Sequence, residues 1–201
     1  MMPKAALLES KPACARFVLD AARELLADVG YGGMSMRQLA GHVGVLPGSL
    51  YHHVDDKQDL LFQVLLDLLE ERDAALKKAS RRVAPLVELR RFIGFLLARQ
   101  MSHSWESTLL EHETRHLRDD LRCQIAQRIE GLQAQLRLLV QRGIQDGVFR
   151  EIDPHAVSLG ILALVKTACA LRNGPGNWTP SSIEDHVYRM SLRLLNAAPP
   201  D

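Results

Sequence analysis

Residues 112–116 read HETRH, which matches the H-E-x-x-H pattern through which zinc hydrolases hold their metal. On an α-helix His112 and His116 would share one face, so both imidazoles could reach one ion while Glu113 acts as the base. A hydrolase also needs a third ligand, and the following letters TRHLRDDLRCQ contain no Gly-x-x-His or comparable pattern. We therefore predict no catalytic residues, no metal and no cofactor. A metal-dependent hydrolase built on HETRH is kept as the alternative function.

A second stretch, residues 35–60, has the spacing of a DNA-reading motif. Ser35 with Gln38 three residues later is a capping box, which predicts a short helix. Gly44 ends that helix, because glycine accepts the left-handed backbone of a tight turn. Pro47 suits the first turn of a second short helix, PGSLYHHV. Two short helices joined by a tight turn predict a helix-turn-helix.

The second helix of such a motif enters the major groove with its N-terminal residues first. Hydroxyl, imidazole and cationic groups beside it can bind phosphate. Residues 1–60 carry six Lys and Arg against seven Asp and Glu, so few phosphate contacts and a modest salt dependence are expected. The predicted DNA-binding residues are Arg37, Pro47, Gly48, Ser49, Tyr51, His52 and Lys57.

The remaining chain is organised to position this motif. Hydrophobic residues make up 47% and aromatic residues 5%, and apolar positions recur with helical rather than strand spacing. The prediction is an all-α protein of roughly nine helices. It consists of an N-terminal three-helix helix-turn-helix domain over 1–60, a connecting helix over 57–80, and a larger C-terminal helical domain over 81–201. Within the last part, helices are expected at about 86–102, 105–117, 119–145, 154–172 and 182–196.

The cysteines and the apolar runs bear on the compartment. Cys14, Cys123 and Cys169 are odd in number and contain no C-x-x-C pair, so a disulfide framework is not expected. The sequence shows no run of about 18 apolar residues, so no membrane partner is predicted. The sequence predicts a cytoplasmic protein.

Residues 18–61, VLDAARELLADVGYGGMSMRQLAGHVGVLPGSLYHHVDDKQDLL, resemble the DNA-binding domain of the TetR family of bacterial transcriptional regulators. The match needs no gaps. Three positions depart from the family pattern: Leu46 replaces a Ser-type cap, Val54 a Phe and Met34 a Thr. The resemblance implies a homodimeric repressor that binds a palindromic operator in double-stranded DNA and is released by a small-molecule effector. It also assigns ligand binding and dimerisation to the C-terminal domain over 81–201. A ligand-binding module without DNA recognition is a third possibility, which Leu46 leaves open.

The C-terminal helices carry the predicted dimer interface. In HAVSLGILALVKTACAL, small residues share one helix face and would let two helices approach closely. The resemblance implies that this helix and the last one meet their symmetry mates in a four-helix bundle. The predicted interface residues are Ala156, Gly160, Ala163, Thr167, Ile183, Val187, Met190 and Leu194.

An effector pocket is expected among the helices of the C-terminal domain. Its predicted walls are Phe92, Phe95, Met101, Trp105, Leu109, Leu136 and Val165. The loop RNGPGNWTP resembles the Asn-Trp loop of acyl-CoA-responsive members of the family, although the Trp-Tyr-Pro string usual there is incomplete. It implies an apolar or acyl-CoA-like effector.

Overall fold

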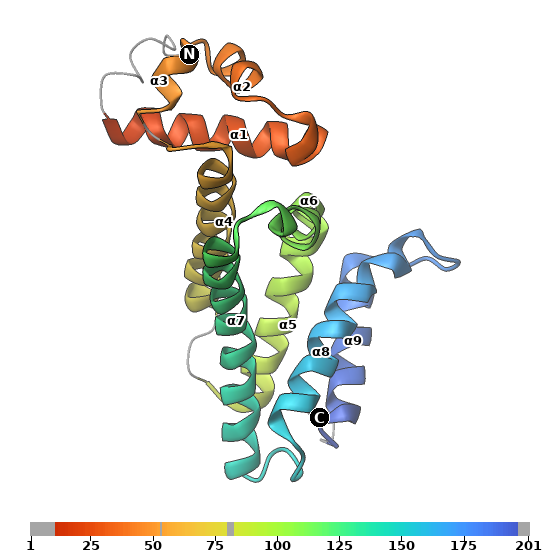
Figure 1. The fold of residues 1–201 in the computed structure, drawn as a ribbon. Helices are drawn as coiled ribbons and strands as arrows, with labels where there is room; N and C mark the ends of the chain where they lie inside the picture. Colours follow the sequence, from red (N-terminus) through yellow and green to blue (C-terminus); the bar gives the residue numbers. More distant parts are fainter. Residues whose placement is uncertain (1–10, 53, 80–82, 197–201) are drawn as a thin grey trace. The chain divides into compact units, whose positions relative to one another are not determined.

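A computed structural model describes residues 11–52, 54–79 and 83–196. Its regular elements over these ranges are all helical, which confirms the predicted all-α class (Figure 1). The elements in chain order are α1 (Lys11–Gly33), α2 (Met36–Val43), α3 (Pro47–Leu50), α4 (Lys57–Ala79), α5 (Pro85–Ser102), α6 (Ser104–Thr108), the π-helix η2 (Leu109–Glu113), the 3-10 helix η3 (Thr114–His116), α7 (Asp119–Gln145), α8 (Pro154–Ala168), the 3-10 helix η4 (Cys169–Asn173) and α9 (Pro180–Leu194).

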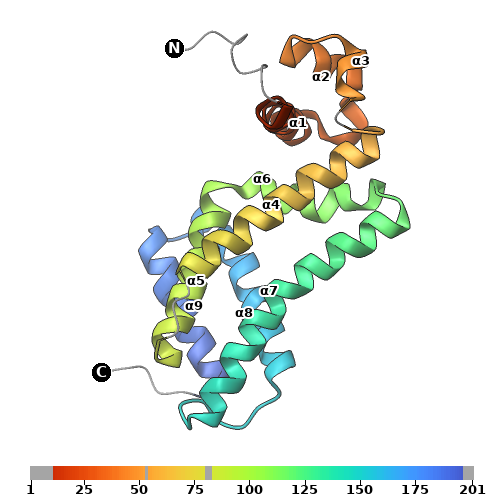
Figure 2. The same ribbon diagram turned by 90° about the vertical axis from the view of Figure 1, so that its left-hand side faces the viewer.

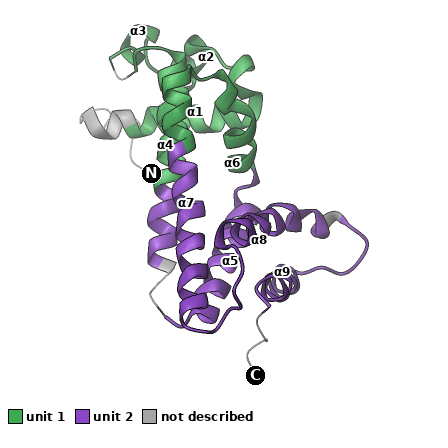
Figure 3. Ribbon diagram, turned by 60° about the horizontal axis from the view of Figure 1, so that its bottom comes forward, with its two compact units in different colours: residues 1–70, 105–126 green, residues 71–104, 127–201 purple. Residues whose placement is uncertain are grey.

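The chain forms two compact units (Figure 3). Unit 1 combines residues 1–70 with residues 105–126, and unit 2 combines residues 71–104 with residues 127–201. The helices α4 and α7 each contribute residues to both units. The segment that contains HETRH therefore belongs to the same unit as the helix-turn-helix. The division into domains 1–60 and 81–201 stays a prediction about function.

In unit 1, α2 packs against α1 and α3 packs against α2, and both lie beside α1 in two views (Figures 1 and 2). The predicted capping box is present: the Ser35 hydroxyl accepts from the Gln38 amide N–H, and the Gln38 side chain accepts from Ser35 N–H. Gly44 adopts φ 81°, ψ 32° and donates its N–H to the Ala40 carbonyl. Local sequence thus sets both ends of α2.

The end of α1 lies beyond Gly30, although glycine is a natural C-cap residue. Helical residues continue to Gly33 across a kink at Gly30, where φ is 68° and ψ is 175°. Only glycine tolerates this conformation without strain. The kink redirects the last residues of α1, and the Met34 N–H donates to the Gly30 carbonyl.

The other part of α1 is tied to α4 by charge. Arg16 and Arg23 both donate to the Asp67 carboxylate of α4, at 3.0 and 2.6 Å. Arg23 and Asp67 are both largely covered, with side chains 17% and 20% exposed. Two guanidinium groups on one carboxylate therefore hold α1 against the first half of α4 within unit 1.

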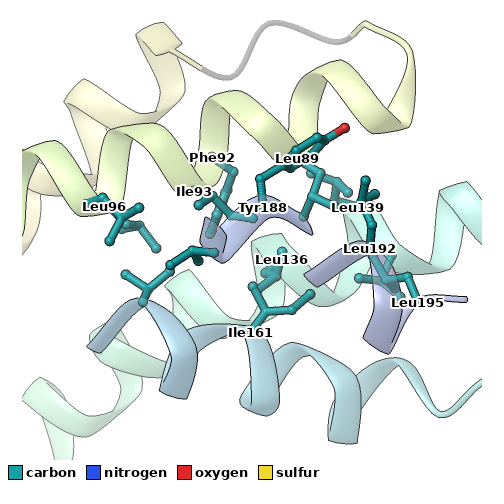
Figure 4. Packing of buried hydrophobic residues seen from close by; sticks show 14 of the residues in the cluster. Leu89, Phe92, Ile93, Leu96, Leu136, Leu139, Ile161, Tyr188, Leu192 and Leu195 are labelled. Atoms are coloured by element: carbon teal, nitrogen blue, oxygen red, sulfur yellow. The ribbon is translucent and has the colours of Figure 1, made fainter. Parts of the chain in front are cut away.

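Unit 2 is built on α5, α8 and α9, which contact one another in all three pairings. Their buried side chains meet those of α7 in one hydrophobic cluster (Figure 4). Phe149, just after α7, folds its ring back onto Gly143, where a Cβ atom would collide with the ring. The Tyr188 hydroxyl donates to the Leu86 carbonyl at 3.3 Å. Burial raises the pKa of this hydroxyl, and the nearby Arg90 guanidinium opposes that shift.

The predicted dimer face divides into exposed and buried residues. On α8, Ala156, Ala163 and Thr167 are exposed and Gly160 is partly exposed, with Leu194 of α9 exposed beside them. Met190 is half-buried. The structure corrects the assignment of Ile183 and Val187: they are 0% and 2% exposed and belong to the core of their own subunit. Neither side chain has surface left for a partner.

One described stretch, residues 154–172, is long and apolar enough to cross a membrane by length and composition alone. Lys166 interrupts this stretch, so it is not the uninterrupted apolar run that the sequence analysis excluded. Within unit 2 one side of α8 packs against α5 and α9, as the core helix of a globular unit does. Its other side carries the small residues of the predicted dimer face.

Candidate nucleic-acid interface

The helix α3 presents almost its whole surface outward. Leu50 is 0% exposed and anchors α3 to the unit, whereas Pro47, Gly48 and Ser49 are exposed. Tyr51 at the end of α3 is 52% exposed, and the following His52 is also exposed. A short helix held by one buried side chain offers its remaining residues to a groove. Five of the seven predicted DNA-binding residues are thus exposed within residues 47–52, on either side of the buried Leu50.

The other two predicted residues lie on neighbouring helices. Arg37 is exposed in the first turn of α2, the helix that packs on α3. Lys57 begins α4, but its ammonium donates to the Tyr31 carbonyl at 2.5 Å and lies 4.0 Å from the centre of the Tyr31 ring. Burial lowers the pKa of the Lys57 ammonium, and the Glu113 carboxylate opposes that shift. The phosphate contact of Lys57 stays a prediction, because here its ammonium is engaged inside the unit.

The start of α4 is held by acidic side chains. The Asp59 N–H donates to the Asp56 carboxylate at 2.7 Å, and the Asp59 carboxylate accepts from the Asp55 N–H at 3.1 Å. Carboxylates at this position satisfy N–H groups of the first turn and complement the helix dipole. The connection between α3 and α4 is therefore defined by local capping.

HETRH does not form the helix face that a zinc hydrolase uses. Its residues span the π-helix η2 and the 3-10 helix η3, so the one-turn spacing of His112 and His116 on an α-helix does not apply. The His112 side chain is exposed, whereas the His116 ring stacks on Tyr31 with centroids 4.8 Å apart. Among the residues that the structure describes, no three His, Cys, Asp or Glu side chains are grouped to hold a metal ion. The hydrolase alternative gains no support.

Glu113 instead joins HETRH to the end of α1. Its carboxylate accepts from the Tyr31 N–H at 3.2 Å and lies 3.5 Å from His116 Nε2. The same carboxylate would lie 3.1 Å from a Cβ atom at Gly30, so the glycine also makes room for it. Tyr31 is thus enclosed by Lys57 and His116 through its ring and by Glu113 through its backbone. Burial raises the pKa of the Tyr31 hydroxyl, and the negative charge of Asp56 adds to that shift.

A second link connects the start of α7 with the start of α4. The Arg118 N–H donates to the Gln58 side chain at 2.8 Å, and the Arg118 guanidinium lies 3.3 Å from the Asp56 carboxylate. Sequence reasoning found neither link, since the partners lie 60 to 82 residues apart. The sequence feature that marks this region is a concentration of charged residues after Leu110.

The predicted effector residues separate between the two units. Phe92, Leu136 and Val165 are buried in the cluster of unit 2, and Phe95 and Met101 pack against it. Trp105 and Leu109 belong to unit 1, where Leu109 is 2% exposed. A pocket lined by all seven residues stays a prediction.

Comparison with known proteins bears directly on this arrangement. Residues 18–64 match the family described as bacterial regulatory proteins of the tetR family, and residues 82–195 match the tetracyclin repressor-like C-terminal domain. One relative is the transcriptional repressor AcnR of Corynebacterium diphtheriae, 35% identical over 103 residues that cover 51% of this chain and 50% of the relative. Another is the repressor KstR2 of Mycolicibacterium smegmatis, 28% identical over 147 residues that cover 70% of each chain. The chain thus spans only about half the length of AcnR in that match.

Solved structures share the fold. AibR in complex with isovaleryl coenzyme A and operator DNA superimposes with a TM-score of 0.76 at 24% identity, over 92% of this chain and all of that one. A tetR-family regulatory protein from Rhodococcus RHA1 gives a TM-score of 0.80 at 23% identity, over 94% and 100% of the two chains. At these identities the likeness concerns the fold, whereas the two family matches together span the helix-turn-helix and the C-terminal helices. The chain belongs to the TetR family of bacterial transcriptional regulators.

Proposed function

We propose that the chain is a homodimeric transcriptional repressor that reads a palindromic operator with α3 and is released by a small-molecule effector. The observation that carries this proposal is the exposed, continuous stretch from Pro47 to His52 around the single buried anchor Leu50. The match to the tetR regulatory domain, the repressor relatives and the operator complex of AibR support it. No enzymatic reaction is proposed, and a regulator of this kind acts in the cytoplasm, where its DNA is.

Dimerisation is part of the proposal because one short helix contacts too few bases. Two copies of α3 about 34–36 Å apart would read two half-sites one helical turn apart. The exposed small residues Ala156, Ala163 and Thr167 on α8 would form the contact, together with Gly160 and Leu194. A closed twofold interface of this kind repeats the same residues on both subunits.

Fluorescence anisotropy on DNA that flanks the gene, with excess non-specific competitor, tests the DNA-binding part. Saturable binding of two chains to one palindrome is expected. Arg37→Ala should weaken it and lower the slope of log affinity against log salt by about 0.9 for each phosphate that is no longer neutralised, so by about 1.8 for a dimer. Binding with the wild-type affinity and slope would remove Arg37 from the interface.

Tyr51→Phe and Lys57→Met complete this series. Tyr51→Phe removes only the hydroxyl, and loss of a hydrogen bond to phosphate should weaken binding about tenfold. For Lys57→Met, a slope reduced by the same amount as in Arg37→Ala would mean that the ammonium leaves Tyr31 to reach DNA. An unchanged slope would mean that Lys57 serves only to hold Tyr31.

We propose that the effector is an apolar acyl-CoA-like molecule that binds against the hydrophobic cluster of unit 2. AibR is described with isovaleryl coenzyme A, and the sequence of the loop RNGPGNWTP gave the same expectation. The helices α4 and α7 each contribute residues to both units. They are therefore the elements through which a bound effector would change the spacing of the two copies of α3 in the dimer. Release requires that the effector bind the two spacings with different affinity.

The effector class is tested on the operator complex. Isovaleryl coenzyme A and longer acyl thioesters should raise the apparent dissociation constant, whereas free coenzyme A and free isovalerate should not. If free coenzyme A and free isovalerate each released the protein from its operator, the release would be non-specific. Phe92→Ala, on the buried face of α5, should abolish the response, with circular dichroism to verify that the variant remains helical.

A further inference from the structure

Leu46 is an exposed apolar side chain at the beginning of the reading helix. At 76% it is the most exposed large hydrophobic residue among those that the structure describes. It occupies the N-cap position of α3 with φ −71° and ψ 142°, and its side chain makes no capping hydrogen bond. Ser, Thr, Asn or Asp at this position would each cap the helix. Leucine therefore loses a cap and exposes apolar surface, and its 76% exposure shows that the described residues of unit 1 leave most of its side chain uncovered.

The neighbouring side chains offer little hydrogen-bonding capacity to base edges. Pro47 and Gly48 have no polar side-chain atom, and Ser49 has one hydroxyl. From Leu46 to His52 there is no Arg, Lys, Asn or Gln, the residues that read guanine and adenine through paired hydrogen bonds. The exposed face of α3 is consequently poor in the groups that read purines.

One base presents a complementary group in the major groove. Thymine carries a C5-methyl there, and apolar side chains contact it, whereas the other bases show only polar atoms or C–H at the corresponding positions. A leucine placed against a polar base edge would desolvate that edge without replacing its hydrogen bonds. Placed against a methyl group, it removes two apolar surfaces from water at once.

We propose that Leu46 is a specificity-determining residue that recognises a thymine in each operator half-site through its C5-methyl group. The inference rests on the proposed function, because it requires that α3 enter the major groove. Leu46 then selects one base in each half-site. The Ser49 hydroxyl does not make this selection at that position. It also gives a reason for the absence of a polar cap, since the side chain acts on DNA and not on its own helix.

The test compares thymine with deoxyuridine, which lacks only the C5-methyl and pairs identically. Each thymine of the footprinted operator is replaced in turn, symmetrically in both half-sites. For the wild-type dimer we expect one position at which the replacement weakens binding about fourfold for each half-site, equivalent to ~0.8 kcal/mol for one buried carbon group. The remaining thymines should change affinity by less than about twofold.

Three variants assign that position to Leu46. Leu46→Ala should bind both operators with equal affinity, and the exposed side chain can be removed without disturbing the fold. Leu46→Met retains an apolar side chain and should retain the preference for thymine. Ser49→Ala, the matched control on the same helix face, should weaken both operators and leave their ratio near the wild-type value.

The outcomes separate the inference from the proposed function. A saturable operator complex in which no deoxyuridine replacement matters, or in which Leu46→Ala keeps the full thymine preference, overturns the role of Leu46 and leaves the repressor in place. Absence of saturable binding to any flanking DNA at low salt refutes the proposed function and the inference together. Loss of the thymine preference in Leu46→Ala, with the preference retained in Ser49→Ala, establishes the role of Leu46.

Discussion

At the scale of single residues, Glu113 has a role that differs from the catalytic one its motif suggests. Its side chain is 13% exposed and accepts the Tyr31 N–H, and so holds the end of α1 against η2. Glu113→Ala should destabilise the protein by about 1–2 kcal/mol, because the Tyr31 N–H loses its partner in a partly buried place. Urea unfolding followed by circular dichroism measures this loss.

Two further variants locate the cause of that effect. Glu113→Gln retains an oxygen acceptor and should recover most of the stability, while Glu151→Ala, at an exposed acidic position in unit 2, should change it by less than about 0.5 kcal/mol. Equal stability of Glu113→Ala and the wild type would mean that the interaction does not contribute to folding. Zinc should not raise the unfolding midpoint of the wild type, and a rise would revive the hydrolase alternative.

At the scale of elements, α7 contains two glycines with opposite environments. A Cβ atom at Gly143 would collide with the buried Phe149 ring, whereas a Cβ atom at Gly131 would meet nothing within 4 Å. Gly143→Ala should therefore destabilise the protein by about 1–3 kcal/mol through overpacking. Gly131→Ala should stabilise it by about 0.5–1 kcal/mol, since alanine favours the helix. Thermal unfolding of the two variants measures both changes in stability. A change of the same sign in Gly143→Ala and Gly131→Ala would contradict the described packing of Phe149.

At the scale of the whole molecule, the proposed dimer depends on the exposed apolar side of α8. Leu159 is 42% exposed on that side, and a charge there would oppose a closed twofold interface. Leu159→Glu should give a monomer by light scattering and should lose operator binding. Leu138→Glu is the matched control, because Leu138 is 63% exposed on α7 outside the predicted interface. A dimeric Leu159→Glu variant would place the interface elsewhere.

Much of this protein could be predicted from the sequence because the relevant signals are local. The capping box at Ser35, the turn at Gly44 and the acidic cap at Asp56 involve neighbouring residues, so they define α2, the turn and the start of α4 without reference to the rest of the fold. The same local order carried the resemblance to the TetR family. Apolar periodicity in the same way predicted α7 over 119–145, the bounds at which the structure has it.

Tertiary structure decided which faces are covered and which distant groups meet. Periodicity shows that α9 has an apolar face, but it cannot distinguish a core face from an interface, and Ile183 and Val187 proved to be core. HETRH could bind a metal as zinc hydrolases do only if it formed a regular α-helix. In the fold, its residues instead contact Tyr31 and lie near Lys57. These contacts join residues far apart in the chain, and their energies depend on burial that no local pattern encodes. The sequence by itself therefore determined the reading motif, and only packing determined what supports it.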